Sequence, residues 1–63
     1  MHSEFRIYTA DYLTNPNNAM ILDVFAKYKD ATKSLKYEYG DECIIVEVKV
    51  DNGEDLDYFI RKV

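Results

Sequence analysis

Glu47 and Lys49 are the residues whose types and spacing come closest to a catalytic pattern. They stand in the apolar run "IIVEVK", where Glu-x-Lys places both side chains on one face of a strand. There the carboxylate, together with a second acid, would hold Mg²⁺, and the ammonium group would position the attacking water. The same letters are also typical of a half-buried strand in which apolar and polar residues alternate.

This pattern resembles the PD-(D/E)xK metal-dependent nucleases, in which an Asp on one strand precedes a (D/E)-x-K on the paired strand. In this chain the nearest upstream acid is Asp41, which belongs to the same strand or to the turn before it. The flanking helices of those much longer enzymes are also missing. We therefore interpret Glu47 and Lys49 as ordinary alternation and predict that the protein is not an enzyme.

Other chemistries find little support in the sequence. The segment "DNGEDLD" lacks the spacing of an EF-hand loop, so it indicates a hairpin turn with acidic flanks. His2 is the only histidine and Cys43 the only cysteine, and they do not stand at ligand spacing. We predict no metal site and no cofactor. The lone cysteine favours a cytoplasmic protein, in which Cys43 serves as a small apolar side chain.

Acidic residues dominate the second half of the chain. The formal net charge is −4. One base, Lys49, stands between residues 38 and 57 among eight acids: Glu38, Asp41, Glu42, Glu47, Asp51, Glu54, Asp55 and Asp57. This balance disfavours binding to a phosphate backbone and suits a basic partner. No targeting segment is visible, and no apolar run approaches the ~20 residues of a membrane helix, so no membrane contact is expected.

The elements that must position these residues form one α+β domain over residues 1–63. A first strand is predicted over residues 4–13. A helix should follow, with Pro16 in its first turn and its end near Lys33 or Ser34. Its buried stripe has helical spacing: Ile21, Val24, Phe25, Tyr28, Ala31 and Leu35. Residues 37–39 alternate as in a short strand, a long and central strand covers residues 42–50, and a last strand covers about residues 55–62.

The predicted fold is β-α-β-β, with one amphipathic helix on one face of a mainly antiparallel sheet of three or four strands. For the hairpin we prefer a three-residue loop ending at Gly53, which pairs Val48 with Leu56 and Val46 with Tyr58. A two-residue loop would place valines and aspartates on one face. The face covered by the helix is then Ile44, Val46, Val48, Leu56, Tyr58 and Ile60.

The opposite face has no second helix to cover it. We predict an exposed patch there with four apolar anchors, Tyr8, Tyr12, Ile45 and Phe59. Its acidic rim is Glu47, Asp55 and Asp57. Such patches usually mark contact with another protein.

The leading functional hypothesis is a non-enzymatic protein–protein interaction module, an acidic inhibitor or adaptor with a basic partner. Homodimerisation through the open face or an edge strand is the companion hypothesis, since a chain this short buries little surface. A second alternative is a nucleic-acid mimic that inhibits a DNA- or RNA-handling enzyme. Small phage-encoded inhibitors are similar in size, charge and build, although no motif is shared. Direct stacking of nucleic-acid bases on the aromatic residues is disfavoured by the surrounding acids.

Overall fold

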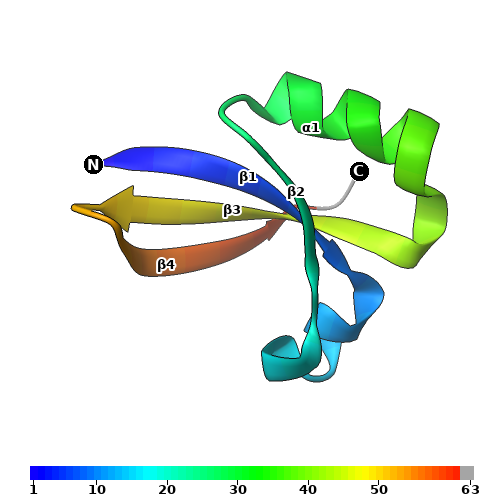
Figure 1. Cartoon of the computed structure of the whole chain (residues 1–63), viewed down its shortest axis with the longest axis horizontal. Coiled ribbons are helices and arrows are strands. Elements are labelled where there is room, and N and C mark those ends of the chain that lie inside the picture. The colour runs from blue at the N-terminus through cyan, green and yellow to red at the C-terminus, as the bar shows by residue number, and fades with distance from the viewer. Residues whose placement is uncertain (62–63) are drawn as a thin grey trace.

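The computed structural model of the protein describes residues 1–61 and has one helix packed against a four-stranded sheet (Figure 1). The strands are β1 (His2–Thr9), β2 (Ile21–Phe25), β3 (Cys43–Asp51) and β4 (Glu54–Arg61). The helix α1 (Tyr28–Ser34) continues into a π-helical turn, η3 (Leu35–Tyr39). Three 3₁₀ turns complete the chain: η1 (Ala10–Leu13), η2 (Pro16–Asn18) and η4 (Gly40–Glu42). The predicted α+β class, with one helix on one face of an antiparallel sheet, is confirmed.

The sheet has the strand order β2-β1-β3-β4, and every neighbouring pair is antiparallel. β1 and β3 are the central strands and pair along their length, from His2 with Val50 to Thr9 with Cys43. The sequence left open which strand pairs with the first one, and β1 pairs with both β2 and β3. The sheet is strongly twisted: β2, at one edge, runs steeply across the direction of β4, at the other edge (Figure 1).

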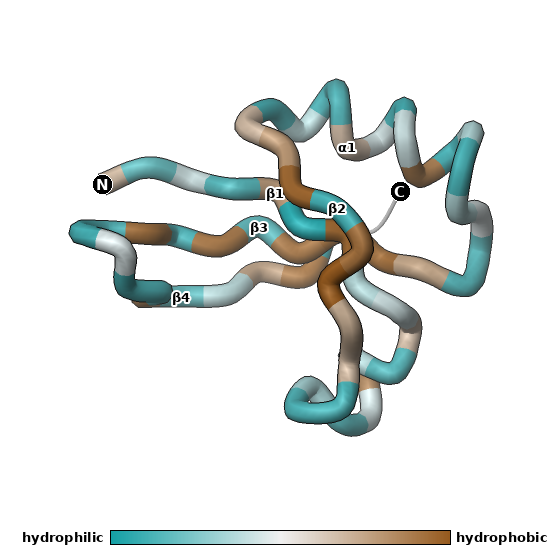
Figure 2. The backbone as a smooth tube through the Cα atoms, viewed as in Figure 1, coloured by the Kyte–Doolittle hydropathy of each residue, from teal (hydrophilic) through white to brown (hydrophobic). Residues whose placement is uncertain are grey.

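The helix begins later than predicted. Residues 21–25, assigned from the sequence to its first turns, form the edge strand β2 instead. Apolar residues lie along almost all of β2 (Figure 2), so the spacing of Ile21, Val24 and Phe25 fits a helix and a strand equally well. β-branched and aromatic residues favour a strand, and β1 supplies the pairing partner. Residues 37–39, whose alternation suggested a short strand but left the assignment open, belong to the π-helical turn.

The β3–β4 hairpin also differs from the prediction. Its turn has two residues, Asn52 (φ 52°) and Gly53 (φ 80°), as in a type I′ turn. Val50 pairs with Asp55, and the register then shifts by one residue at Leu56. Beyond this bulge Val48 pairs with Tyr58 and Val46 with Ile60, not with Leu56 and Tyr58. The bulge places Tyr58 and Ile60 on the same face as Val48 and Val46, which removes the reason for rejecting a two-residue loop.

The core consists of two clusters, one on each face of the sheet. On the helix side, Ile7 and Ile45 of the sheet pack with Ala31 of α1 and Leu35 of η3. On the opposite face lie Tyr8, Val46, Val48 and Val50.

The prediction that Ile44, Val46 and Val48 meet the helix is therefore wrong. The alternation along β3 was identified correctly, but the helix covers the other set of residues. On the other face, Tyr12 of η1 and Ala19 pack against the cluster that holds the valines.

Candidate functional site

The four predicted anchors do not form one patch. Ile45 is fully buried beneath the helix, and Tyr8 is buried on the other face, where its ring lies 4.7 Å from that of Tyr12. Phe59 pairs with Glu47 on the helix side and is 44% exposed. The prediction that these anchors share one exposed surface is wrong, because Tyr8 and Ile45 belong to opposite clusters of the core.

Glu47, predicted on the acidic rim, is buried at the centre of an ion network on the helix side of the sheet. Its Oε1 accepts hydrogen bonds from the guanidinium of Arg61. Its Oε2 accepts one from the Ser3 hydroxyl at 3.0 Å and lies 3.1 Å from Lys49 Nζ. Chiefly through Arg61, then Lys49, these donors lower the pKa of Glu47 from 4.5 to about 2. The network joins β1, β3 and β4.

The Glu-x-Lys pair is therefore part of a cluster in which one carboxylate is paired with two cations. Lys49 Nζ also donates to Ser3 Oγ at 2.8 Å, so the ammonium group is divided between a hydroxyl and the Glu47 carboxylate. Within residues 1–61, no group of three or more His, Cys, Asp or Glu side chains is placed to hold a metal ion. The sequence pattern pointed to Glu47 and Lys49 but not to Ser3 and Arg61, which the strand register brings to them.

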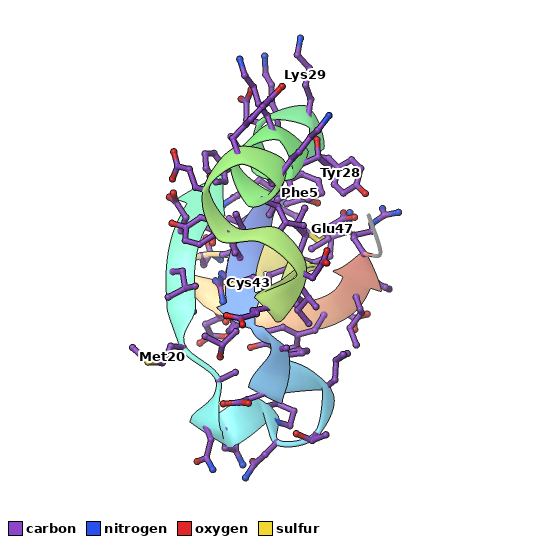
Figure 3. The ribbon with its side chains drawn as sticks, turned by 90° about the vertical axis from the view of Figure 1, so that its right-hand side faces the viewer. Phe5, Met20, Tyr28, Lys29, Cys43 and Glu47 are labelled. Carbon is purple, nitrogen blue, oxygen red and sulfur yellow. The ribbon has the colours of Figure 1, made fainter. Side chains whose placement is uncertain are left out.

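Aromatic side chains border this network. In Figure 3, Glu47 lies on the same side of the molecule as Phe5 and Tyr28, beneath the start of α1. The rings of Phe5 and Tyr28 are 5.7 Å apart, and the Arg61 guanidinium lies 5.8 Å from the Tyr28 ring. Arg61 therefore contacts a carboxylate and an aromatic face, which restricts its orientation.

Arg6 is the centre of a second network, on the face away from the helix. Its side chain is only 12% exposed, and its two terminal nitrogens each donate to Asp55 at 2.9 Å. Nε donates to Glu4 at 3.1 Å, and the Tyr58 hydroxyl donates to Asp55 at 2.8 Å. The Asp55 contact raises the pKa of Arg6, and Arg6 in turn lowers the pKa of Asp55. Asp55 is therefore held in an intramolecular ion pair, although the sequence placed it on a rim facing a partner.

Four apolar side chains remain half exposed on the face away from the helix. We call them the open-face patch: Ile21 (49%), Val24 (46%), Tyr58 (47%) and Ile60 (47%). The first two lie on β2 and the last two on β4, on either side of the buried cluster around Val46. The sequence missed this patch because it assigned Tyr58 and Ile60 to the core under the helix.

Charge is distributed unevenly over the surface. Lys29, Lys33 and Lys36 follow one another at helical spacing and are exposed, and Lys29 extends away from the sheet (Figure 3). At the other end of the sheet the β3–β4 hairpin carries acids, of which Glu54 and Asp57 are exposed. The protein therefore has a basic helix surface and an acidic hairpin.

Cys43 and His2 lie at opposite ends of the central strand pair, because Cys43 pairs with Thr9 while His2 pairs with Val50. Cys43 is partly buried against the helix-side cluster, and burial raises the pKa of its thiol. These positions agree with the prediction that Cys43 acts as a small apolar side chain.

Over residues 1–61, no helix has both the length and the apolar character needed to cross a membrane. Comparison with protein-family models, curated proteins and solved structures found no match to this chain.

Proposed function

We propose that this chain is a non-enzymatic protein–protein interaction module, a small cytoplasmic inhibitor or adaptor that binds a basic partner through the open-face patch. The observation that carries the proposal is the half exposure of four large apolar side chains on one sheet face. Tyr58 suits the role of an anchor because its hydroxyl is held by Asp55. A side chain already fixed in place loses less conformational entropy on binding.

The charge of the chain supports a basic partner. The net charge is −4, and the exposed carboxylates of Glu54 and Asp57 lie on β4, the strand that also carries Tyr58 and Ile60. Such charges mainly accelerate association and select the partner, while the apolar contacts supply most of the affinity. Because exposed charges are screened, the association rate should fall as salt is raised.

A catalytic role for Glu47 and Lys49 is less well supported. Both oxygens of Glu47 are occupied by groups of the chain itself, including Arg61. In the proposed function this network stabilises the sheet that carries the patch. Divalent-metal-dependent nuclease activity that is lost in Glu47→Gln would overturn the non-enzymatic proposal.

The proposal is tested with two variants that differ in the face they alter. Ile21→Ser with Ile60→Ser removes two members of the open-face patch, and Phe59→Ser removes a similarly exposed side chain from the helix side. Affinity capture from the source cell, quantified by mass spectrometry, should lose its specific partner with the double variant alone. Equal capture by both variants would place the binding surface elsewhere.

The same variants examine self-association. If the open-face patch binds a second copy of the chain, sedimentation equilibrium from micromolar to millimolar concentration should show a dimer. Ile21→Ser with Ile60→Ser should abolish this dimer. A wild-type monomer over this range excludes the dimer and leaves the patch for another protein.

The class of partner follows from a competition experiment. A nucleic-acid mimic and duplex DNA or RNA would exclude each other from the captured partner. Simultaneous binding would favour an ordinary adaptor. A phage-encoded inhibitor remains the most specific form of the mimic proposal, and its partner would be a nucleic-acid-handling enzyme of the host.

A further inference from the structure

β2 forms an edge of the sheet, and over residues 1–61 no strand pairs with its outer side. The direction of its backbone groups follows from the ladder. Thr9 donates its N–H to Met20 O at 3.1 Å, so alternate residues of β1, including Ile7 and Phe5, point their backbone groups toward β2. Arg6 points toward β3, and its partner Val24 therefore directs its N–H and carbonyl outward from the sheet.

The outward N–H of Val24 donates to the carboxylate of Asp23 at 2.9 Å. An oxygen atom thus occupies the place that the carbonyl of an added strand would take. The other edge has the same arrangement, because the Tyr58 N–H points outward and donates to Asp57 at 3.0 Å. A side chain that satisfies an edge amide in this way can be replaced by a strand without leaving the amide unpaired.

The surroundings of the two edges differ. Beside β2, between the strand and the helix, lies a groove of about 430 Å³. Its lining includes Asp23, Phe25, Asp30, Lys33, Tyr37 and Glu38. Three carboxylates thus face one ammonium group, and two rings supply apolar walls. Beside β4 the corresponding hollow holds the cations of Lys49 and Arg61 with the buried Glu47.

We propose that β2 is a strand-addition site for an extended segment of the partner in which Lys or Arg alternates with apolar residues. The proposal rests on the function proposed above and specifies the partner's chemistry. Side chains of a strand alternate between its faces. One set would enter the groove, with a hydrocarbon chain along Phe25 and Tyr37 and a cationic end near Asp30. The other set would meet Ile21 and Val24.

Asp23 takes part both in the backbone pairing with the added strand and in the binding of its cationic side chain. Its carboxylate leaves the Val24 N–H when the carbonyl of the added strand arrives. Because Asp23 also lines the groove, the carboxylate can then pair with the incoming cation. The same recognition at β4 is disfavoured by Arg61 and Lys49, which would repel a basic side chain.

The test uses a synthetic peptide with blocked ends, Val-Lys-Val-Lys-Val-Lys-Val, and ¹⁵N-labelled full-length protein. Amide shifts are expected at β2 and α1, with slower hydrogen exchange of the Val24 N–H. A peptide with Glu in place of Lys should not bind. Shifts centred on Tyr58 and β4, or equal binding of the Glu peptide, would overturn the proposal.

Variants separate the backbone contact from the charge. Val24→Pro removes the outward N–H without removing a ladder hydrogen bond, as edge strands tolerate, and it should abolish binding. Asp30→Asn with Glu38→Gln should weaken binding about tenfold, because both carboxylates are exposed and water screens their attraction to the incoming cation. Glu42→Gln removes an exposed carboxylate of η4 that does not line the groove, and this control should leave binding unchanged.

A second probe is independent of the folding of the Pro variant. Two peptides of the same sequence, each N-methylated at the backbone amides of one edge, cannot donate hydrogen bonds from that edge. The peptide methylated on the edge that faces β2 should fail to bind, whereas the one methylated on the outer edge should still bind. Binding that survives methylation of each edge in turn overturns strand addition. If the peptide fails but Ile21→Ser with Ile60→Ser still abolishes partner capture, the module function stands and the β2 site is wrong.

Discussion

Arg6 and Glu47 lie on the two central strands and carry opposite charges to opposite faces of the same sheet. Each is a buried centre with more exposed partners: the side chain of Arg6 is 12% exposed and that of Glu47 8%, whereas Asp55 is 30% and Arg61 51% exposed. The two centres differ in chemistry. A guanidinium cannot be discharged at ordinary pH, but a carboxylate can. Acid therefore acts on the centre of the Glu47 network and only on the partners of Arg6.

The two side chains also differ in what they cover. Arg6 starts on β1 and reaches Asp55 on β4, so its hydrocarbon chain must cross β3 above the valines. Glu47 is short, and its partners come to it from the neighbouring strands. Arg6 thus stabilises the fold by packing and by charge, whereas Glu47 acts mainly by charge. Substitution of Arg6 should therefore lower the free energy of unfolding the most. Protonation in acid should weaken the Glu47 network the most.

The largest effect is expected for Arg6→Ala. Loss of the hydrocarbon cover and of the bidentate bonds to Asp55 should lower the free energy of unfolding by about 3 kcal/mol. Urea denaturation followed by circular dichroism measures the loss. Arg6→Met keeps most of the packing and should cost about 1 kcal/mol. Equal losses in the two variants would show that packing by Arg6 contributes little.

A smaller effect is expected for Glu47→Gln. The amide retains the shape of the side chain, but it turns a donor toward Arg61, Lys49 or Ser3, and the charge-assisted bonds are lost. We expect a loss of about 2 kcal/mol in the free energy of unfolding, measured in the same way. Glu54→Gln, at an exposed position on β4, should change stability by less than ~0.5 kcal/mol. A neutral result at Glu47 would mean that the network is dispensable.

Acid weakens both networks, and Glu47→Gln separates their contributions. The pKa of Glu47 is lowered from 4.5 to about 2 in the folded state, so its contribution is complete above pH 4.5 and is lost as pH falls toward 2. The pKa of Asp55 is lowered too, so the Arg6 network adds to the same loss. Thermal melts of the wild type should decline over this range, and Glu47→Gln should decline less. Parallel curves would assign the acid sensitivity to other carboxylates.

The smallest effect is expected for Lys49→Met. The Lys49 side chain is 39% exposed, and its ammonium group is one of several donors to Glu47, so water and Arg61 can replace it. The cost should stay below ~1 kcal/mol in the same denaturation experiment. A loss as large as that of Glu47→Gln would show that Lys49 is the main partner of Glu47. That result would contradict the larger part of Arg61 in lowering the pKa of Glu47.

The sequence was sufficient for the fold class because alternation and helical spacing are local patterns. It was insufficient where one pattern fits two structures. Ile21, Val24 and Phe25 satisfy both periodicities, and only pairing with β1 makes this segment a strand. Likewise the first part of β3, residues 43–46, is apolar on both faces, so Ile45 and Val46 were equally suitable to meet the helix.

The candidate site was harder to predict because it depends on register. One extra residue at Leu56 moves Tyr58 from Val46 to Val48 and leaves Asp55 within reach of Arg6. A bulge has no clear local signature in this sequence. Of the predicted site residues, Phe59 and Asp57 are exposed as expected, while Tyr8, Ile45 and Glu47 are buried.

The pairing of β1 with β3 affects how the chain can fold during synthesis. Residues 2–9 are made first, but their central partner is residues 43–50. Until β3 has been synthesised, β1 can pair only with β2 and bury little apolar surface. The closure of this long loop must precede most of the contacts that stabilise it, which predicts slow folding for a domain of this size. The domain should therefore acquire its structure only after β3 has been synthesised and has become free to pair with β1.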